Sequence, residues 1–318
     1  YDLVQWGYDV AIFEKEKKAG GMVTYAIPDF RMDKKAFDFE AMQLKEMGVK
    51  FHFNSRLGKD FSLEKLSKEF DSVILAIGLN QSKTLDIIEK NIPSIKKTDA
   101  LSFLKSFNLK NIKIKNSSVI LVIGGGNSAI DAARSAKKLN PKNKVIVSCI
   151  ETEAVMPAFA EEVKHASDEG IEFIFESFVK SVSAPKGKKI AVALHSFGNK
   201  KHIRNLQCDN IITAIGQTTE TSIIENLPAD ENARVKSKDS YTGYKNVFAA
   251  GDICAGNNMS VIGAIASGKK AAVGVRKLLE NYSYEYEGEK ALNRLNTLSH
   301  YLSKTKTEKV LPLGKDLG

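Results

Sequence analysis

Residues Ser118–Asp131 read SVILVIGGGNSAID, and the rest of the chain is organised around them. Five apolar residues, Val119 to Ile123, lead directly into three glycines, and Asn127 then opens an amphipathic run that extends to Leu139. A short apolar run that ends in glycine and is followed by helical periodicity indicates a strand, a tight turn and a helix. The sequence therefore predicts a β–α unit of the kind from which α/β folds are built.

The glycine turn has the pattern Gly-x-Gly-x-x-Ala, a variant of the dinucleotide-binding fingerprint. Gly124 allows the tight turn, Gly126 lets a pyrophosphate approach the backbone, and Ala129 lets the helix pack closely on the strand. The N–H groups of Asn127 and Ser128 would then face the phosphate oxygens, where the positive end of the helix dipole favours negative charge. The strand–turn–helix context favours nucleotide binding over the alternative of a merely structural turn.

The composition is that of an ordinary globular chain. Its 318 residues are enough for two domains, 43% of them are hydrophobic, and no apolar run approaches the roughly 20 residues of a membrane helix. The net charge of +9 comes mostly from lysines spread along the chain. A nucleic-acid surface would gather that charge on one face with interleaved aromatics. Solvated lysine is therefore the better interpretation, and neither nucleic acid nor membrane is expected as a partner.

Three cysteines, Cys149, Cys208 and Cys254, lie far apart and form no Cys-x-x-Cys pair. This spacing argues against a disulfide framework, a zinc site, a self-contained iron–sulfur cluster and a redox-active cysteine pair. The five histidines also lack the spacing of metal ligands. The sequence therefore predicts no metal site, and it predicts a reducing, cytoplasmic compartment.

Two further segments indicate that the nucleotide-binding unit is present twice. Asp71–Gly78 reads DSVILAIG and Asp209–Gly216 reads DNIITAIG, and an acidic residue closes a second strand in each copy, Glu14 in one and Glu151 in the other. Glu14 precedes Asp71 by 57 positions, and Glu151 precedes Asp209 by 58. By the spacing of the second copy, the glycine turn of the first copy is expected about a dozen residues before Tyr1, outside the sequence.

Other regular elements are expected around these two units. Helices are predicted over 34–48, 98–107, 158–170 and 260–280. Residues 172–183 and 189–196 alternate in the manner of strands, with the turn PKGKK from Pro185 between them as a hairpin. The remainder, residues 281–318, is polar and Lys-rich and is expected to form a tail or a partner-docking arm.

Several separate motifs, in order, resemble the small-subunit family of glutamate synthase and its relatives. They are AGGMVTYAIPDFR, VIGGGNSAIDAARSAKKL, MPAFAEEVKHASDEGIEF, TAIGQ, NVFAAGDI and GAIASGKKAA, and they extend the resemblance over about residues 1–280. The resemblance implies an α/β fold with two Rossmann-like dinucleotide-binding domains, the NAD(P)H domain being inserted into the FAD domain. On that template the FAD-binding domain is 1–110 plus 217–280, with its first strand and glycine turn missing, and the NAD(P)H-binding domain is 111–216.

The resemblance also implies where FAD would bind in the first half of the chain. Glu14 would hold the FAD ribose, and Gly78 would lie on the adenosine side. Gly20, Gly21 and Met22 of the AGGM motif would line the flavin side, and Arg31, also named for cofactor binding, closes the Ile-Pro-x-Phe-Arg motif.

The second half of the chain would complete that FAD site. Gly251 and Asp252 would bind the ribityl and pyrophosphate region, with Asp252 accepting a hydrogen bond from a ribityl hydroxyl. N–H groups at the start of the next helix would face the pyrimidine edge of the flavin, where negative charge builds on reduction: those of Gly263, Ala264 and Ile265. Each residue could instead be a turn or packing residue, and only their joint order favours the FAD interpretation.

The NAD(P)H site would be built in the central copy from Gly124, Gly126, Asn127, Ser128, Glu151 and Gly216. Family members usually read Tyr-Arg-Arg-Thr-Arg before the Met-Pro-Ala motif, and those arginines meet the 2′-phosphate of NADPH. Residues 149–153 stand there in this chain and include no arginine. A carboxylate at Glu151 would accept hydrogen bonds from a ribose diol and repel a 2′-phosphate. NADH is therefore predicted over NADPH, with loss of the dinucleotide site as the alternative.

The predicted function is electron transfer from NAD(P)H, with NADH favoured, through FAD to a partner redox centre, for example an iron–sulfur protein or a large amidotransferase-like subunit. Family members often carry an N-terminal cysteine-rich segment, so an iron–sulfur cluster is expected only on such a missing segment or on the partner. No catalytic side chain is predicted, because hydride transfer to a flavin needs stacking and orientation. The alternative is a degenerate, flavin-free nucleotide-binding module with a regulatory or scaffold role.

Overall fold

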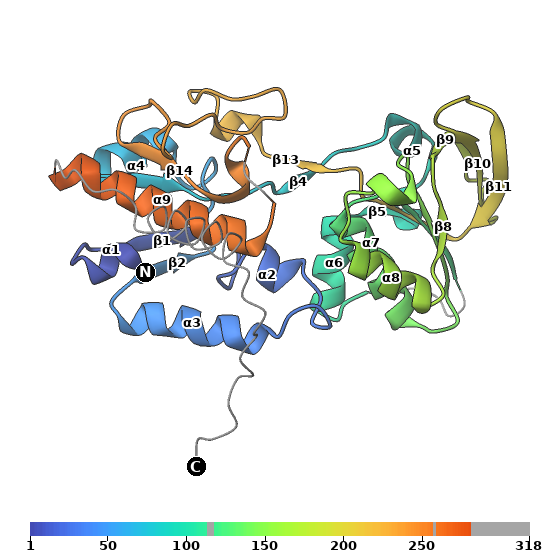
Figure 1. The fold of residues 1–318 in the computed structure, drawn as a ribbon, viewed down its shortest axis with the longest axis horizontal. Coiled ribbons are helices and arrows are strands. Elements are labelled where there is room, and N and C mark those ends of the chain that lie inside the picture. Colours follow the sequence, from blue (N-terminus) through green and yellow to red (C-terminus); the bar gives the residue numbers. More distant parts are fainter. Residues whose placement is uncertain (113–117, 257–258, 281–318) are drawn as a thin grey trace, which may run out of the picture.

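A computed structural model describes residues 1–112, 118–256 and 259–280, so the expected tail over 281–318 lies outside the described residues. The chain forms two α/β units joined by a narrow connection (Figure 1). We call residues 83–216 the central unit, and residues 1–80 with 219–280 the first unit. No helix in the described ranges, the 20-residue α9 (Val261–Glu280) included, combines the length and apolarity that crossing a bilayer requires.

The central unit is built on a five-stranded parallel sheet in the order β5-β12-β6-β7-β8. Its strands are β5 (Lys97–Asp99), β12 (Asn210–Thr213), β6 (Val119–Ile123), β7 (Lys144–Ser148) and β8 (Glu172–Ile174). β6 lies in the middle of the sheet and is buried after its first residue, as expected of an apolar parallel strand covered on both faces. The predicted strand–turn–helix is therefore the centre of an α/β sheet.

The described residues of the central unit include four α-helices: α5 (Asp86–Asn91), α6 (Ala100–Asn108), α7 (Asn127–Leu139) and α8 (Ala160–Asp168). Four fully buried alanines let α7 pack closely on the sheet: Ala129, Ala132, Ala133 and Ala136. Before the predicted domain boundary near residue 110, which stays a prediction, β5 pairs with β12 and α6 packs on α7. Phe103 and Leu104 of α6 are buried in the core of the central unit.

A second, antiparallel sheet extends the central unit, in the order β11-β10-β9. Its strands are β9 (Ser177–Ser183), β10 (Ile190–Ser196) and β11 (His202–Cys208), and the predicted hairpin after Pro185 joins the first two. A single strand over 172–183 is wrong. The chain breaks at Glu176, which has a left-handed φ of +49°, and divides into β8 of the parallel sheet and β9 of the antiparallel one.

The first unit contains two pairs of parallel strands instead of one continuous sheet. β1 (Ala11–Glu14) pairs with β2 (Lys50–Phe53), and β3 (Val73–Leu75) pairs with β14 (Val247–Ala249). Its helices are α1 (Asp2–Gln5), α2 (Met22–Tyr25), α3 (Lys34–Glu46), α4 (Leu63–Glu69) and α9. In the central unit, β6 lies between β7 and β12 and pairs with both. In the first unit, no described strand lies in the equivalent position between β1 and β3.

The internal repeat has a structural counterpart in the connection between the units. Gly78 follows β3 and Gly216 follows β12, and both have positive φ, +62° and +106°. Each leads into a short strand, β4 (Gln81–Ser82) or β13 (Gln217–Thr218), and these two strands pair antiparallel. The chain therefore leaves the first unit and returns to it through one two-stranded connection (Figure 1).

Candidate nucleotide-binding sites

The glycine turn of the central unit is shaped by a close backbone approach. Gly124 has a φ of +135°, and a Cβ atom there would lie less than 3 Å from the carbonyl oxygen of Ala214, just beyond β12. Only glycine adopts this conformation without strain and fits this space. Gly126 differs, since it caps α7 with an ordinary φ of −89° and a Cβ there would meet nothing within 4 Å. The open side of the turn is therefore at Gly126.

The start of α7 offers two backbone donors to an anion. No described residue accepts a hydrogen bond from the N–H of Asn127 or of Ser128. Their side chains are engaged: Asn127 Oδ1 accepts from the N–H of Phe159 at 2.9 Å, and Ser128 Oγ accepts from Gln217 Nε2 at 3.2 Å. The side chains of Asn127 and Ser128 thus fix the first turn of α7, while the backbone N–H groups of these two residues stay available. Free N–H groups at a helix N-terminus are suited to binding phosphates.

Glu151 lies against the same turn, three residues beyond the end of β7. Its Oε2 atom would be 2.6 Å from a Cβ on Gly125. The same atom is buried, and it has no hydrogen-bond partner in the described chain. Since a buried carboxylate oxygen is costly without a donor, this acceptor is suited to a ligand hydroxyl.

The carboxylate also affects a neighbouring thiol. Burial, together with the charge of Glu151, raises the pKa of Cys149 to about 11. Burial likewise raises the pKa of Cys208 to about 12 and the pKa of Cys254, and all three cysteines are free and buried.

We expect none of the three thiols to react in the native protein at neutral pH, because the thiolate is the reactive form and each thiol is shielded from solvent. Titration with a chromogenic disulfide reagent should detect no thiol before denaturation and three afterwards. Rapid reaction of Cys149 in the native state would show that the region beside Glu151 is more open than the structure indicates.

In the first unit, the glycines before α2 have different roles. Gly20 has a φ of +115°, and a Cβ there would lie less than 3 Å from Thr24 and Phe37, so its small size is needed for packing. Gly21 caps α2 and opens on empty space. The side chain of Met22 packs against the core of the central unit. Glu14, at the end of β1, accepts a hydrogen bond from the N–H of Glu16 at 2.9 Å.

Gly251 and Asp252 follow β14 in the short helix η4 (Gly251–Ile253), beside the start of α9. Gly251 has a φ of +77°, and its N–H donates to Ser267 Oγ at 3.0 Å. Asp252 Oδ1 is buried and has no hydrogen-bond partner in the described chain, and burial raises the pKa of this carboxyl. This second unpaired acceptor lies where the sequence placed a ribityl contact.

The donors expected at the start of α9 are already engaged. The N–H of Gly263 donates to Ser260 Oγ at 3.0 Å, and the N–H of Ala264 donates to the carbonyl of Ser260 at 2.9 Å. These two N–H groups therefore already have partners in the described chain, and their contact with a flavin stays a prediction. The helix begins at Val261, two residues before Gly263, so Ile265 lies in its second turn.

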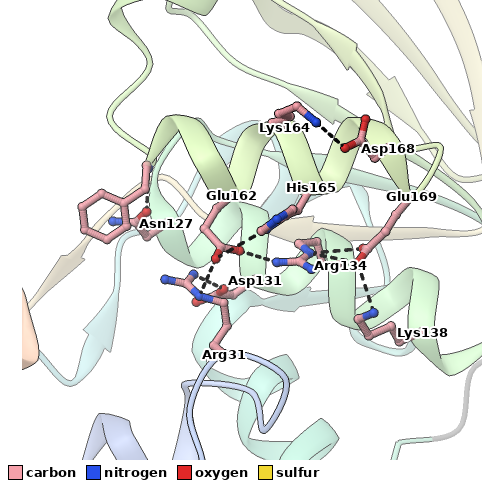
Figure 2. Close-up of polar contacts among 11 residues, drawn as sticks. Arg31, Asn127, Asp131, Arg134, Lys138, Glu162, Lys164, His165, Asp168 and Glu169 are labelled. Atoms are coloured by element: carbon pink, nitrogen blue, oxygen red, sulfur yellow. Dashed lines mark hydrogen bonds and ion pairs between the residues drawn. The ribbon is translucent and has the colours of Figure 1, made fainter. Parts of the chain in front are cut away.

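Arg31 forms its ion pairs with residues of the central unit. It follows α2 in a loop that reaches the central unit, and its guanidinium pairs with Asp131 of α7 and Glu162 of α8 (Figure 2). Sequence analysis predicted no partner for Arg31. A signal was present nonetheless, because Asp131 is a charged residue among the small apolar residues of α7.

A cavity of about 500 Å³ lies beside the connection between the units and includes none of the predicted site residues. Its charged residues are already engaged: Lys97 pairs with Glu89 at 2.6 Å, and Asp99 accepts a hydrogen bond from the hydroxyl of Ser82 at 2.6 Å. The buried acceptors without a partner and the free donors of the described chain therefore favour the glycine turn and the Asp252 region as sites.

A profile of the pyridine nucleotide-disulphide oxidoreductase family matches residues 3–268, which include both units. The chain belongs to this family. Its three cysteines are free and buried, so no two of them form a disulfide in the structure.

Relatives in this family confirm the resemblance to the glutamate synthase small-subunit group. The NAD-dependent dihydropyrimidine dehydrogenase subunit PreT of Escherichia coli (strain K12) is 31% identical over 285 residues, covering 87% of this chain and 64% of that protein. The glutamate synthase [NADPH] small chain of the same organism is 26% identical over 314 residues, covering 87% and 65%. The chain thus spans slightly less than two thirds of these relatives.

The fold is similar to that of solved structures. Lactococcus lactis thioredoxin reductase in its FR conformation matches with a TM-score of 0.68 at 18% sequence identity, and the match covers 88% of this chain and 93% of that chain. The predicted fold class, α/β with two Rossmann-like dinucleotide-binding domains, is confirmed.

Proposed function

We propose that the protein transfers electrons from NADH through FAD to a redox centre on a partner protein. The observation that carries this proposal is the pair of buried, unpartnered carboxylate oxygens, one in each unit. Glu151 Oε2 would accept from a hydroxyl of the NADH ribose, and Asp252 Oδ1 from a ribityl hydroxyl of FAD. Each oxygen then gains the donor that the described chain does not supply.

The chain's own residues would bind and orient the two nucleotides. The free N–H groups of Asn127 and Ser128 would bind the pyrophosphate of NADH, and Glu151 would select its ribose. FAD, when bound near Asp252, supplies the two-electron acceptor. No side-chain acid or base is assigned, because the work of the protein in such a transfer is orientation.

Glu151 favours NADH because a carboxylate attracts the ribose diol and repels a 2′-phosphate. The relatives named above include both an NAD-dependent subunit and an NADPH-dependent chain, so the family alone does not decide the donor. Both are subunits or chains of larger enzymes by name, which supports a partner redox centre for this protein, with any iron–sulfur cluster on that partner or on a further segment. The free cysteines support a cytoplasmic location.

A flavin-free regulatory or scaffold module is the second candidate. It is favoured by the engaged N–H groups of Gly263 and Ala264 and by the divided sheet of the first unit. Release of bound cofactor from the purified protein by denaturation, followed by chromatography, separates the two. FAD in about one equivalent supports electron transfer, whereas a colourless protein that cannot be reconstituted with FAD supports the module.

A further inference from the structure

Arg31 joins the two units through two carboxylates of the central unit. Its Nη1 atom lies 2.7 Å from Asp131 Oδ1, and its Nε atom lies 2.9 Å from Glu162 Oε1. Figure 2 shows the guanidinium between α7 and α8, with one acid from each helix turned towards it. Because the guanidinium is a rigid planar fork, it fixes direction as well as distance for both carboxylates.

Further charged residues of the central unit extend this group of ion pairs. Arg134 pairs with Glu162 and also with Glu169, at 2.8 Å from the latter, and Lys138 lies 3.1 Å from Glu169. The residue before Arg31 takes part as well: the ring of Phe30 lies 4.8 Å from the Arg134 guanidinium and 4.9 Å from the Lys138 ammonium. The loop thus meets a preorganised surface and adds a cation–π contact to the ion pairs.

Arg31 is the only hydrogen-bond or ion-pair partner of the Asp131 side chain in the described chain. The side chain of Asp131 is 10% exposed and that of Glu162 is 13% exposed. Burial raises the pKa of Asp131, and the charge of Arg31 opposes that effect. Loss of Arg31 would leave a buried carboxylate without a partner, so the structure depends on this contact.

The contact lies on the helix that presents the nucleotide site. Asp131 is one turn along α7 from Asn127, at the glycine turn. The covalent connection is only the short β4–β13 pair, and further contacts tie α6 to the segment before Arg31: Lys105 to Glu16 at 2.7 Å, and Asn108 to the carbonyls of Tyr25 and Ile27. Arg31 is therefore placed to set the angle of α7 relative to the first unit.

We propose that Arg31 is a positioning residue that sets the orientation of the central nucleotide site relative to the first unit by bridging Asp131 and Glu162. This proposal rests on the proposed function, since the orientation governs how the nicotinamide meets the acceptor in the first unit. Arg31 then acts on the rate of electron transfer and leaves NADH binding unchanged, because it lies outside the residues assigned to NADH.

The kinetic test compares Arg31→Met and Arg31→Lys with a control, Arg204→Met. The control removes the ion pair between Arg204 and Glu172, which lies within the central unit. At saturating NADH, we expect Arg31→Met to slow flavin reduction in a single turnover by about 10- to 100-fold, as small misplacements do, with the dissociation constant of NADH almost unchanged. Arg31→Lys should recover part of the rate, and Arg204→Met should match the wild type. A purely structural role would lower the melting temperature without this selective loss of rate.

A distance measurement tests the same proposal without activity. Spin labels on cysteines introduced at Glu40 of α3 and Lys180 of β9, both exposed, report the arrangement of the two units by pulsed electron paramagnetic resonance. We expect one narrow distribution in the wild type and in Arg204→Met, and a broad or shifted one in Arg31→Met. If Arg31→Met does not fold, Asp131→Asn removes the charge at constant size and should give the same change.

Failure of the proposed function and failure of the positioning role of Arg31 would give different results. A wild type that holds no flavin, or whose flavin NADH does not reduce, contradicts the proposed function, and the distance measurement still reports on Arg31. An unchanged narrow distribution in both Arg31→Met and Asp131→Asn, or in Asp131→Asn alone when Arg31→Met does not fold, overturns the positioning role whatever the activity.

Discussion

Gly124→Ala is expected to lower the free energy of unfolding of the protein by about 3 to 5 kcal/mol, or to prevent folding altogether. Two costs combine at this position. A φ of +135° is strained for any residue with a Cβ, and the Cβ would lie less than 3 Å from the carbonyl oxygen of Ala214. Backbone atoms of neighbouring parallel strands cannot move apart without breaking the pairing of β6 with β12. Urea unfolding followed by circular dichroism measures the change.

Gly126→Ala, two residues along the same turn, is the matched control. Its φ of −89° suits alanine, and the new Cβ meets nothing within 4 Å, so the free energy of unfolding should change by less than about 1 kcal/mol. NADH affinity should nevertheless fall, because the Cβ would occupy the open side of the turn. Equal destabilisation by both substitutions would contradict the close approach at Gly124, and unchanged NADH affinity in Gly126→Ala would contradict pyrophosphate binding there.

Glu151→Gln is expected to remove the preference for NADH over NADPH. The amide keeps the size of the side chain but not its charge, so the hydrogen bonds from the ribose weaken and the repulsion of a 2′-phosphate disappears. We expect about tenfold weaker NADH binding, equivalent to about 1.4 kcal/mol, together with tighter NADPH binding. Calorimetric titration of the wild type and the variant with both nucleotides measures the four affinities.

Glu153→Gln is the control for charge, since Glu153 is an exposed carboxylate two residues further along the chain. It should leave both affinities at the wild-type values, because screened surface charges contribute little. Equal effects of the two substitutions would indicate a general change in surface potential. A wild type that binds NADPH as tightly as NADH would refute the assignment of Glu151 to the ribose.

Sequence patterns within short stretches of the chain predicted much of the fold. The repeated AIG segments and the equal acid-to-acid spacing predicted two similar units, and both glycines of the repeat have positive φ in the structure. Periodicity did not reveal the break at Glu176, because residues on both sides of it alternate in the same way while entering different sheets. It also missed β11, a polar strand at the edge of its sheet where only Leu206 and Cys208 are buried.

Sequence analysis predicted only those parts of the candidate site whose residues lie close together in the sequence. The glycine turn and Glu151 lie together as their spacing implied, since both follow neighbouring parallel strands. Of the two partners of Arg31, Asp131 is 100 positions away and Glu162 lies further along the chain, and no local rule connects either of them to Arg31. The N–H groups of Gly263 and Ala264 are engaged because Ser260 caps α9, and Ser260 was visible in the sequence three residues before Gly263.

The most direct measurement is the anaerobic reduction of bound flavin in the purified protein, followed by its visible absorbance as NADH or NADPH is added. We expect NADH to bleach the flavin band stoichiometrically and rapidly, and NADPH to do so far more slowly. A flavin band that neither nucleotide changes, or that NADPH bleaches as fast as NADH, would contradict electron transfer from NADH selected by Glu151.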